Sequence, residues 1–477
     1  MGNIFEAGVP TEEERNRTLR PLRFLGMGML IAWLCCTHVP DIYCGESDAL
    51  RRVASTGMRY GDIGMFLLLA ACASRIGSLG SHMKIAGVLV AVCCVGTALT
   101  GLILVPIGAP VEVVMTASAA TALGGAILFC LWAEVYSQMG STQIVVYGAG
   151  SCLVAFGLYA LVSMMMHPYA VFATALLPIG SFACVASSFV LVPHEAARSK
   201  AARYAVPWKI VAIMALAGFA SGLAGSVLAN PEGGQAAVHR IWATGVAGAV
   251  ILGLALLRSE KFDARFLAQA CVPLALAACL LMPAAWSIAG FMVSFFVKLA
   301  YVWFTIFALM LLANLAFRFG IPTLRMFAIA RACSEAAIFS GVIIRRFLEG
   351  SGLSQDGTVL LISACAGVVV VCVCVLLWRS ERAVNADWGA AGIEVASGER
   401  VMGPRERLIL RCEQLARTHG LTARETEVLT LIAQRKTRSE IEQELFLSQN
   451  TVKTHVRHIY AKLGIHSKSD VYELVGQ

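Results

Sequence analysis

The chain has 477 residues, of which 58% are hydrophobic and only 14% are charged, and its mean hydropathy is +0.73. A soluble globular protein carries about 25% charged residues, so this composition excludes a purely soluble chain. The charge is unevenly distributed, because 22 of the 78 residues in 400–477 are charged, against 40 of the 378 residues in 1–378. The formal net charge of +8 therefore averages an apolar membrane domain and a short, polar, basic C-terminal domain.

The 16 cysteines suggest a disulfide scaffold or a metal site at first sight, but most of them lie in apolar runs. There Cys behaves as a small hydrophobic residue. No Cys-x-x-Cys pair is followed by a second pair or by His at zinc spacing, so we expect no metal site and no cofactor. The N-terminus is polar for about 20 residues and has no small-residue cleavage pattern, which predicts that there is no cleavable signal peptide.

Twelve apolar runs approach the roughly 20 residues that a helix needs to cross a bilayer. Helices this apolar lack the polar face of a soluble helix, and small residues, as in 215–225, allow them to pack closely. We therefore predict an all-α fold, a polytopic transmembrane bundle of about 12 spans in the lipid bilayer, followed by a small soluble four-helix domain. The predicted spans are 22–39, 61–76, 85–106, 113–134, 143–165, 168–192, 207–229, 240–258, 264–282, 285–316, 323–344 and 357–378.

The loops predict the orientation of the bundle. With the N-terminus inside, 17 Lys and Arg residues lie on inner segments and six on outer segments. Basic residues favour the cytoplasmic side, so the N-terminus and the C-terminal domain are both expected in the cytoplasm. The protein is accordingly expected in the cell inner (cytoplasmic) membrane as a multi-pass chain.

The longest inner connection, residues 194–208, divides the predicted spans into halves 1–192 and 207–378. In helix count and loop placement, the domain 1–378 resembles the major facilitator family. That resemblance implies two six-helix halves (6+6) joined by a basic cytoplasmic loop. The loop 74–84 lacks the acidic residue of the family's signature and has few basic residues, which argues against coupled transport.

Three charged residues lie well inside predicted spans: Lys298, Arg331 and Glu335. Charges in lipid are costly and usually face the bundle interior. Arg331 and Glu335 are four positions apart, so they share one helix face and can pair. Two interpretations stay open: a site that binds an unknown small-molecule ligand or gates the domain, or a structural ion pair with Lys298 reaching an interface. Acidic residues near predicted span ends are expected at the membrane interfaces: Asp62, Glu112 and Glu134.

Residues 379–404 have no apolar period and are rich in Ala and Gly, which predicts a flexible cytoplasmic linker. About 25 residues of such a chain span roughly 25–30 Å on average. The C-terminal domain, residues 405–477, is therefore tethered close to the inner membrane surface.

Capping residues predict the helices of this domain. Three helix starts carry Ser or Thr with an acidic residue three positions later, as in a capping box: Thr422–Glu425, Thr437–Glu440 and Ser467–Asp470. On one later helix the apolar residues fall on a single face: Val452, Val456, Ile459 and Leu463. Gly464 follows them and suits the end of that helix.

The other face of that helix is basic and polar, and it carries Asn450, Lys453, Thr454, Arg457 and His458. A short helix with one packed face and one basic face, held at an angle by a preceding short helix, suits insertion into the DNA major groove. A basic amphipathic helix can also lie on a membrane or bind a calmodulin-like partner. The capped helices that precede this one argue against both alternatives.

The segments LTARETEVL (421–429), NTVKTHV (450–456) and IYAKLG (459–464) resemble the LuxR-type helix-turn-helix of transcriptional regulators, over about 55 residues. The resemblance implies a four-helix domain with a recognition helix from about Gln449 to Leu463 and dimerisation partly through Ser467–Leu474. It also implies base contacts by Lys453, Thr454 and Arg457, and contacts nearer the phosphates by Asn450, Thr451 and His458. The chain departs from the family at two positions: Arg435, where relatives often have Gly in a turn, and Glu442, where they often have Ala.

The sequence thus predicts a membrane-embedded, one-component transcriptional regulator that binds DNA as a homodimer, with the transmembrane domain as its sensor. The alternative is a secondary transporter with an appended DNA-binding regulatory domain, which the intramembrane charges favour. An enzyme is not expected, because we find no nucleophile–base pattern, phosphate loop or pair of suitably placed carboxylates.

Overall fold

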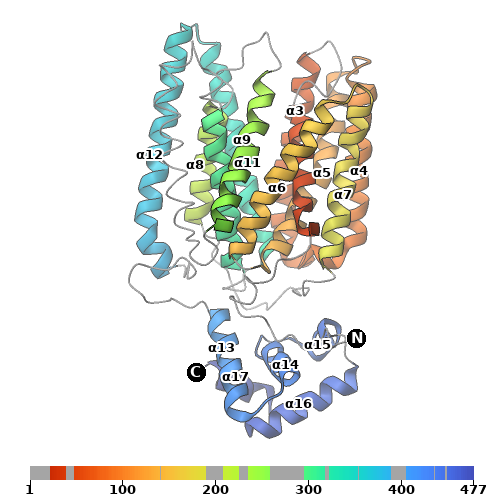
Figure 1. The fold of residues 1–477 in the computed structure, drawn as a ribbon, viewed down its shortest axis with the longest axis vertical. Coiled ribbons are helices and arrows are strands. Elements are labelled where there is room, and N and C mark those ends of the chain that lie inside the picture. Colours follow the sequence, from red (N-terminus) through yellow and green to blue (C-terminus); the bar gives the residue numbers. More distant parts are fainter. Residues whose placement is uncertain are drawn as a thin grey trace.

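The computed structural model describes residues 22–38, 48–139, 141–189, 208–224, 235–257, 295–316, 322–352, 354–387, 404–434, 436–445 and 448–476. Within these ranges the chain is helical and contains no strand. Figure 1 shows two units, a bundle of long helices and a small group of short C-terminal helices. The structure therefore confirms the all-α class.

The described helices of the bundle coincide with predicted spans. Those of the first half are α2 (Met27–His38, preceded by the 3-10 turn Leu22–Gly26), α3 (Asp48–Ile76), α4 (Met83–Leu99, continued by the π turn Thr100–Leu104), α5 (Val111–Tyr136), α6 (Ser141–Ser163) and α7 (Tyr169–Phe189). Those of the second half are α8 (Trp208–Ala224), α9 (Gln235–Leu257), the helix Phe295–Ala316, α11 (Thr323–Glu349) and α12 (Gln355–Asp387). The span predicted at 264–282 and the start of the span at 285–316 lie outside the described residues.

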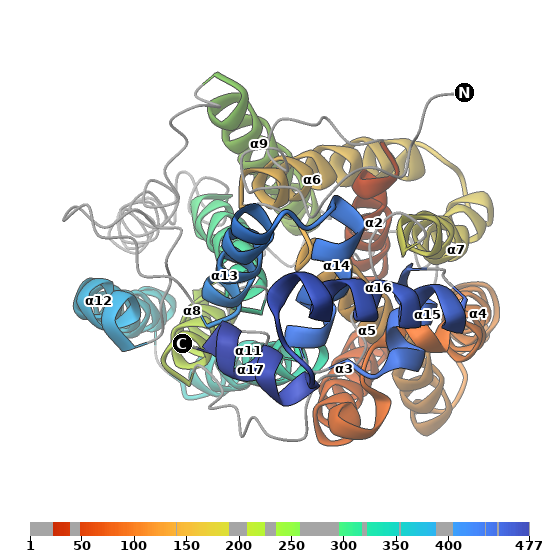
Figure 2. The ribbon, with the colours of Figure 1, turned by 90° about the horizontal axis from the view of Figure 1, so that it is seen from below.

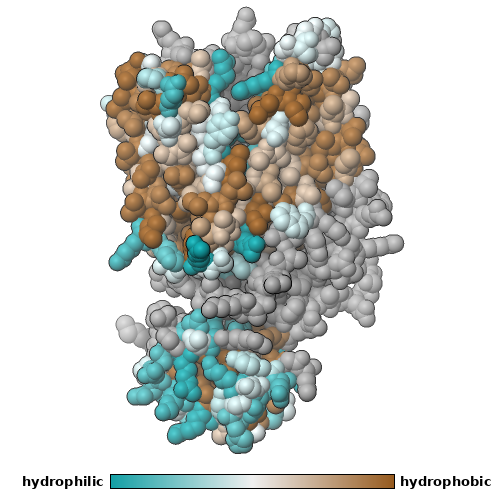
Figure 3. Space-filling view, turned by 180° about the vertical axis from the view of Figure 1, so that it is seen from behind, coloured by the Kyte–Doolittle hydropathy of each residue, from teal (hydrophilic) through white to brown (hydrophobic). Residues whose placement is uncertain are grey.

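The outer surface of the bundle is apolar. Among the described helices, six are long and apolar enough to cross a membrane by length and composition. Large apolar side chains are exposed on several helices of the bundle: Leu67, Val88, Val95, Leu176 and Phe347. Figure 3 shows this brown surface on the bundle and a mainly teal surface on the C-terminal unit. Lipid stabilises such an apolar surface and water does not, so the bundle is a membrane domain.

Small residues bring helices of the bundle into close contact. A Cβ atom on Gly222 of α8 would lie 2.1 Å from the carbonyl oxygen of Ile338 in α11, and one on Gly341 would lie 2.5 Å from that of Phe219. The small residues predicted to allow close packing therefore do so between α8 and α11. Among the described helices, the halves of the bundle meet where α3 and α5 pack against α11 and where α6 packs against α9.

Two predicted boundaries were wrong. Helix α3 begins at Asp48, not at residue 61, because Arg51, Arg52 and Arg59 lower the hydropathy of a segment that is nevertheless helical. Asp62 is consequently in the middle of α3 and only 9% exposed, not at an interface as predicted. Helix α12 continues to Asp387, so the linker predicted from residue 379 starts as helix. Charged residues end an apolar run there, but they do not end a helix.

Glu134 is also buried rather than interfacial, since it is 8% exposed near the end of α5. Its carboxylate accepts hydrogen bonds from the hydroxyl of Ser78 (2.8 Å) and from the backbone N–H groups of Leu79 (2.8 Å) and Gly80 (3.1 Å). The loop between α3 and α4 contains no acidic residue of its own. The carboxylate of α5 therefore satisfies the backbone of this loop.

The C-terminal unit comprises α13 (Pro404–His419), α14 (Ala423–Ala433), α15 (Arg438–Leu445), α16 (Gln449–Leu463) and α17 (Lys468–Gly476). Helix α13 thus precedes the four helices that the family resemblance implies. Figure 2 shows this unit from below, in front of the bundle. It has a hydrophobic core of its own, formed by residues from all five helices, among them Cys412, Leu429, Ile441, Val456 and Val471. This separate core indicates that the unit can fold without the bundle.

Candidate DNA-binding surface and intramembrane cavity

Helix α16 has defined ends. The hydroxyl of Ser448 caps it by accepting a hydrogen bond from the N–H of Thr451 at 3.3 Å. Gly464 ends it with a left-handed φ of 67°, a conformation that glycine adopts without steric cost. The helix therefore spans Gln449–Leu463, the range that the resemblance predicts for the recognition helix.

One face of α16 is packed and the other is exposed. Val452, Val456, Ile459 and Leu463 are at most 8% exposed and belong to the core of the unit. The candidate DNA-contacting residues occupy the opposite face, where all but the half-buried Thr451 are exposed: Asn450, Lys453, Thr454, Arg457 and His458. The periodicity of the sequence therefore assigned both faces of the helix correctly. Five exposed residues, two of them cations, therefore lie on the face of α16 that is turned away from the core.

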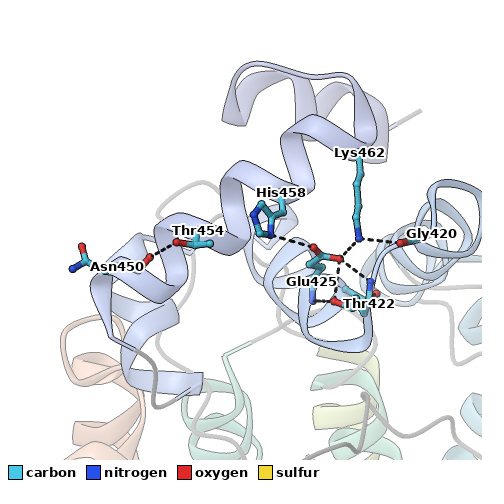
Figure 4. A network of polar contacts seen from close by, with 8 residues as sticks. Gly420, Thr422, Glu425, Asn450, Thr454, His458 and Lys462 are labelled. Atoms are coloured by element: carbon cyan, nitrogen blue, oxygen red, sulfur yellow. Dashed lines mark hydrogen bonds and ion pairs between the residues drawn. The ribbon is translucent and has the colours of Figure 1, made fainter.

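Two of these candidates make local hydrogen bonds. The hydroxyl of Thr454 donates to the carbonyl oxygen of Asn450 at 2.9 Å, as Figure 4 shows. The hydroxyl of Thr451 lies 2.8 Å from that of Ser448. Thr451 therefore takes part in the cap of α16, which its sequence position did not reveal.

The angle between α14 and α16 is fixed by a carboxylate (Figure 4). Glu425, at the start of α14, is 4% exposed, and its Oε2 accepts hydrogen bonds from Lys462 Nζ at 2.7 Å and Thr422 N at 2.8 Å. The same Lys462 Nζ donates to the carbonyl oxygen of Gly420 at 3.1 Å. His458 Nδ1 lies 3.8 Å from Glu425 Oε1. The network ties both the loop before α14 and the start of that helix to α16.

The network also sets the charge state of Glu425. Burial disfavours the ionised carboxylate and so raises its pKa. The hydrogen bonds from Lys462 and Thr422 stabilise the ionised form more strongly, and the pKa is lowered from 4.5 to about 2. Glu425 is thus negatively charged at neutral pH and attracts the ammonium group of Lys462 on α16. The sequence predicted the capping box of Thr422 and Glu425, which the structure confirms. It did not predict Lys462, although Lys462 follows His458 by one helical turn.

A second missed residue connects α14 with α15. Arg424 pairs with Glu427 at 2.5 Å and donates from Nη2 to the carbonyl oxygen of Leu445 at 2.7 Å, at the end of α15. The other predicted cap, Thr437 with Glu440, is present at the start of α15. Of the two departures from the family pattern, Arg435 lies outside the described residues. Glu442 is half-buried, and no described residue makes a hydrogen bond with its Oε1.

A cavity of about 300 Å³ lies inside the bundle, between helices of both halves. All three charged candidates line it, Lys298 from the helix Phe295–Ala316 and Arg331 and Glu335 from α11. Arg59 and Asp62 of α3 line it as well. Sequence reasoning missed these two because the start of α3 was placed too late.

The charged groups in this cavity contact one another and aromatic rings. Arg331 forms an ion pair with Glu335, as the spacing predicts, and its guanidinium lies 4.9 Å from the ring centre of Phe129. Lys298 Nζ lies 4.8 Å from the ring centre of Tyr301. Both distances are typical of cation–π contacts. Lys298 therefore lies inside the domain, at the same cavity as the pair. Among the described residues, no three His, Cys, Asp or Glu side chains are grouped for a metal ion.

Comparison with known proteins identifies the C-terminal unit. Residues 419–475 match the family model "Bacterial regulatory proteins, luxR family". The C-terminal unit contains a LuxR-type helix-turn-helix domain. Transcriptional regulatory protein LiaR of Bacillus subtilis (strain 168) is 49% identical over 50 residues, which are 10% of this chain and 24% of LiaR. HTH-type transcriptional regulator MalT of Klebsiella pneumoniae (strain 342) is 40% identical over 70 residues, 14% of this chain and 8% of MalT. The chain thus spans a quarter or less of these relatives.

Solved structures identify the fold of the bundle. The proton:xylose symporter XylE, of the major facilitator superfamily, aligns with a TM-score of 0.54 and 16% identity, over 75% of this chain and 94% of XylE. A bacterial homologue of the iron transporter ferroportin aligns with a TM-score of 0.55 and 13% identity, over 76% of this chain and 100% of that chain. At this identity the likeness concerns the fold alone. The bundle has a major facilitator fold, and the chain joins it to a LuxR-type domain.

Proposed function

We propose that this protein is a membrane-embedded, one-component transcriptional regulator that binds DNA through α16. The observation that carries the proposal is the exposed basic face of α16 within a LuxR-type domain on the same chain as a major facilitator fold. LiaR and MalT, which match this domain, are regulators by name. The proposed location is the cell inner membrane, with the N-terminus and the C-terminal domain in the cytoplasm.

On this proposal the candidate residues of α16 divide by their partner on DNA. Lys453, Thr454 and Arg457 contact base edges in the major groove, while Asn450, Thr451 and His458 lie nearer the phosphates. Symmetric half-sites require two such helices. The protein therefore acts as a homodimer, with α17 contributing to the contact between the C-terminal domains.

The bundle is the proposed sensor. Lys298, Arg331 and Glu335 meet at the intramembrane cavity, where a small molecule can contact helices of both halves at once. A ligand that binds one arrangement of the halves more tightly shifts the population toward that arrangement. The shift would reach DNA through α12 and the chain that follows it.

Genome-wide mapping of DNA bound by the full-length protein tests the proposal. We expect discrete bound loci for the wild type and their loss in Arg457→Ala. Arg417→Ala, which removes an exposed arginine from the last turn of α13, is the matched control and should retain the loci. An absence of loci in the wild type, or a map that Arg457→Ala leaves unchanged, would refute the assignment of α16.

A simpler test uses fragment 400–477, which contains the whole core of the C-terminal unit. Its affinity for a mapped site should fall steeply as salt rises, because neutralised phosphates release counterions. Binding that does not respond to salt contradicts the proposed contacts.

A second candidate function, a secondary transporter with an appended regulatory domain, is supported by the charged cavity and by the fold shared with XylE. Transport requires that the cavity open to each side of the membrane in turn. Uptake of the ligand into vesicles, measured at a concentration that changes how much DNA the protein binds, distinguishes the sensor from the transporter. A change in DNA binding without uptake supports a sensor. Saturable uptake that Arg331→Ala abolishes supports a transporter.

A further inference from the structure

His458 lies at the boundary between the core of the C-terminal unit and the surface proposed to contact DNA. Its side chain is 50% exposed, and its Nδ1 lies 3.8 Å from Oε1 of Glu425 on the neighbouring helix α14. Figure 4 shows the imidazole ring directed toward this carboxylate. An imidazole changes its charge between about pH 5 and pH 8, so the contact is an ion pair whenever the ring carries a proton.

The carboxylate in this contact is a permanent anion. Burial of Glu425 raises the pKa of its carboxyl group, but the hydrogen bonds from Lys462 and Thr422 lower that pKa overall to about 2. The group is therefore ionised at every pH at which histidine titrates. The capping box also fixes its position, because Thr422 and Glu425 bond to each other through both backbone and side chain. The negative charge beside His458 is thus constant in sign and in place.

The cations near His458 either compete for this carboxylate or bind elsewhere. Lys462 follows His458 by one turn of α16 and donates to the other oxygen of Glu425 at 2.7 Å. Arg457 precedes His458 in the chain and is exposed. Arg424, next to Glu425 on α14, pairs with a different carboxylate of that helix. Helices α13 and α15 also pack against α16, but no charged side chain that the structure describes on them contacts the ring.

A DNA phosphate adds a second anion to this arrangement. On the proposed function, His458 lies near the phosphates when α16 enters the major groove. Since Nδ1 faces Glu425, the phosphate meets Nε2 on the other side of the ring. An opposite charge within about 4–6 Å favours the charged form of a titratable group. An imidazolium donates from both nitrogens, so it can bind the two anions at once.

We propose that His458 takes up a proton from solvent when α16 binds DNA, and that the resulting imidazolium bridges Glu425 and a DNA phosphate. Glu425 is then a positioning residue, because it directs the ring and stabilises its charge without contacting DNA. The inference rests on the proposed function, since it requires DNA at this face of α16. The complex holds more protons than the separate molecules, so a fall in pH favours binding. The affinity for DNA therefore rises as the pH of the surrounding solution falls through the neutral range.

Calorimetric titration of fragment 400–477 with a mapped DNA site, in buffers that differ in their enthalpy of ionisation, counts the protons taken up. We expect the wild type to take up about half a proton per bound α16 at pH 7 and to bind about fivefold more weakly at pH 8 than at pH 6. His458→Gln should lose both effects. His458→Lys, which carries a fixed charge, should bind well at pH 8 without proton uptake.

The fragment contains three further histidines that also titrate: His419, His455 and His466. The pH dependence of the imidazole NMR signals, with and without DNA, assigns the uptake to individual rings in the wild type and should assign it to His458. His419→Gln alters an exposed histidine in the last turn of α13. It is the matched control and should keep the wild-type pH dependence. Glu425→Gln, in samples shown to be folded at the same pH, should take up fewer protons.

Binding of the mapped site without proton uptake, or an uptake that His458→Gln retains, would overturn the inference and leave the proposed function intact. An unchanged uptake in folded Glu425→Gln would overturn the bridge between the two anions. If the wild-type fragment bound no DNA at any pH, the proposed function would fail together with the inference. The two failures are therefore distinguishable in one set of titrations.

Discussion

Lys453 and Arg457 lie one helical turn apart on the exposed face of α16. On the proposed function, their side chains form charge-assisted hydrogen bonds with base edges. We expect Lys453→Ala and Arg457→Ala each to weaken binding of fragment 400–477 to its mapped site by about 1–3 kcal/mol, measured by fluorescence anisotropy.

Arg417→Ala, on α13, is the matched control and should change this affinity little. Substitution of a phosphate contact such as Asn450 should weaken binding to all sequences alike. If both basic variants bound specific and random DNA as the wild type does, another surface would have to make the base contacts.

Glu425 predicts a dependence of stability on pH. Its pKa is about 2 in the folded domain and 4.5 ordinarily, so the folded state binds a proton more weakly than the unfolded state. The stabilisation is complete above about pH 5 and is lost as pH falls toward 2. We expect this group to contribute about 1–3 kcal/mol to the fall in free energy of unfolding of fragment 400–477 over that range, measured by urea denaturation.

Glu425→Gln should therefore be less stable than the wild type at pH 6 and should lose less stability on acidification. Glu473→Gln, which alters an exposed carboxylate on α17, serves as the control and should follow the wild type. Identical pH profiles for Glu425→Gln and the wild type would contradict the role of the network.

Single residues were predictable where local spacing determines their environment. The caps at Thr422 and Thr437 and the two faces of α16 follow from positions three and four apart, and the structure has them. Lys462 and Arg424 act through partners 37 and 21 positions away, and no local pattern encodes such distances. Asp62 was misplaced for a related reason, since its environment depends on helices that pack against α3 from the other half.

The contact between α8 and α11 makes a prediction at the scale of an element. A Cβ on Gly222 would overlap the carbonyl group of Ile338, whose oxygen would be 2.1 Å away. Gly222→Ala must therefore push α8 and α11 apart, at a cost of about 1–3 kcal/mol. We expect a lower melting temperature for the full-length variant in detergent.

Gly253 of α9 gives a matched control, because a Cβ there has no atom within 4 Å. Gly253→Ala should melt at or above the wild-type temperature, since alanine favours helix. Equal melting temperatures for the two variants would mean that α8 and α11 separate without cost.

The described helices of the bundle were predictable from the sequence in type and order, and less so at their ends, whereas α13 was not predicted. An apolar run stops at the first charges, whereas a helix stops where backbone hydrogen bonding or capping changes. The early start of α3 at Asp48 and the late end of α12 at Asp387 both have this cause. Gly464 and Ser448 set the ends of α16 chemically, and there the prediction was accurate.

For the whole molecule, the continuation of α12 past residue 378 gives the bundle a helical connection toward the C-terminal domain. Ala383→Pro removes a backbone hydrogen bond and breaks the helix there, at a cost of about 3 kcal/mol. On the proposed function, the output of a mapped promoter in this variant should shift from the wild-type level toward that of fragment 400–477 expressed alone. A reporter assay at equal protein levels measures the shift.

Ala383→Ser, which keeps the helix, is the control for this variant and should give the wild-type output. If Ala383→Pro also gave the wild-type output while the fragment differed from it, signal transfer would not require an intact α12.

The covalent continuity of α12 with the bundle has a consequence for the chromosome. On the proposed function, the DNA-binding domain diffuses only laterally, with the lipid, and cannot leave the membrane to search the nucleoid. Each target operator must itself approach the bilayer, and an occupied operator holds its stretch of chromosome at the membrane. The position of a gene in the cell, as well as its operator sequence, would then determine how soon it responds.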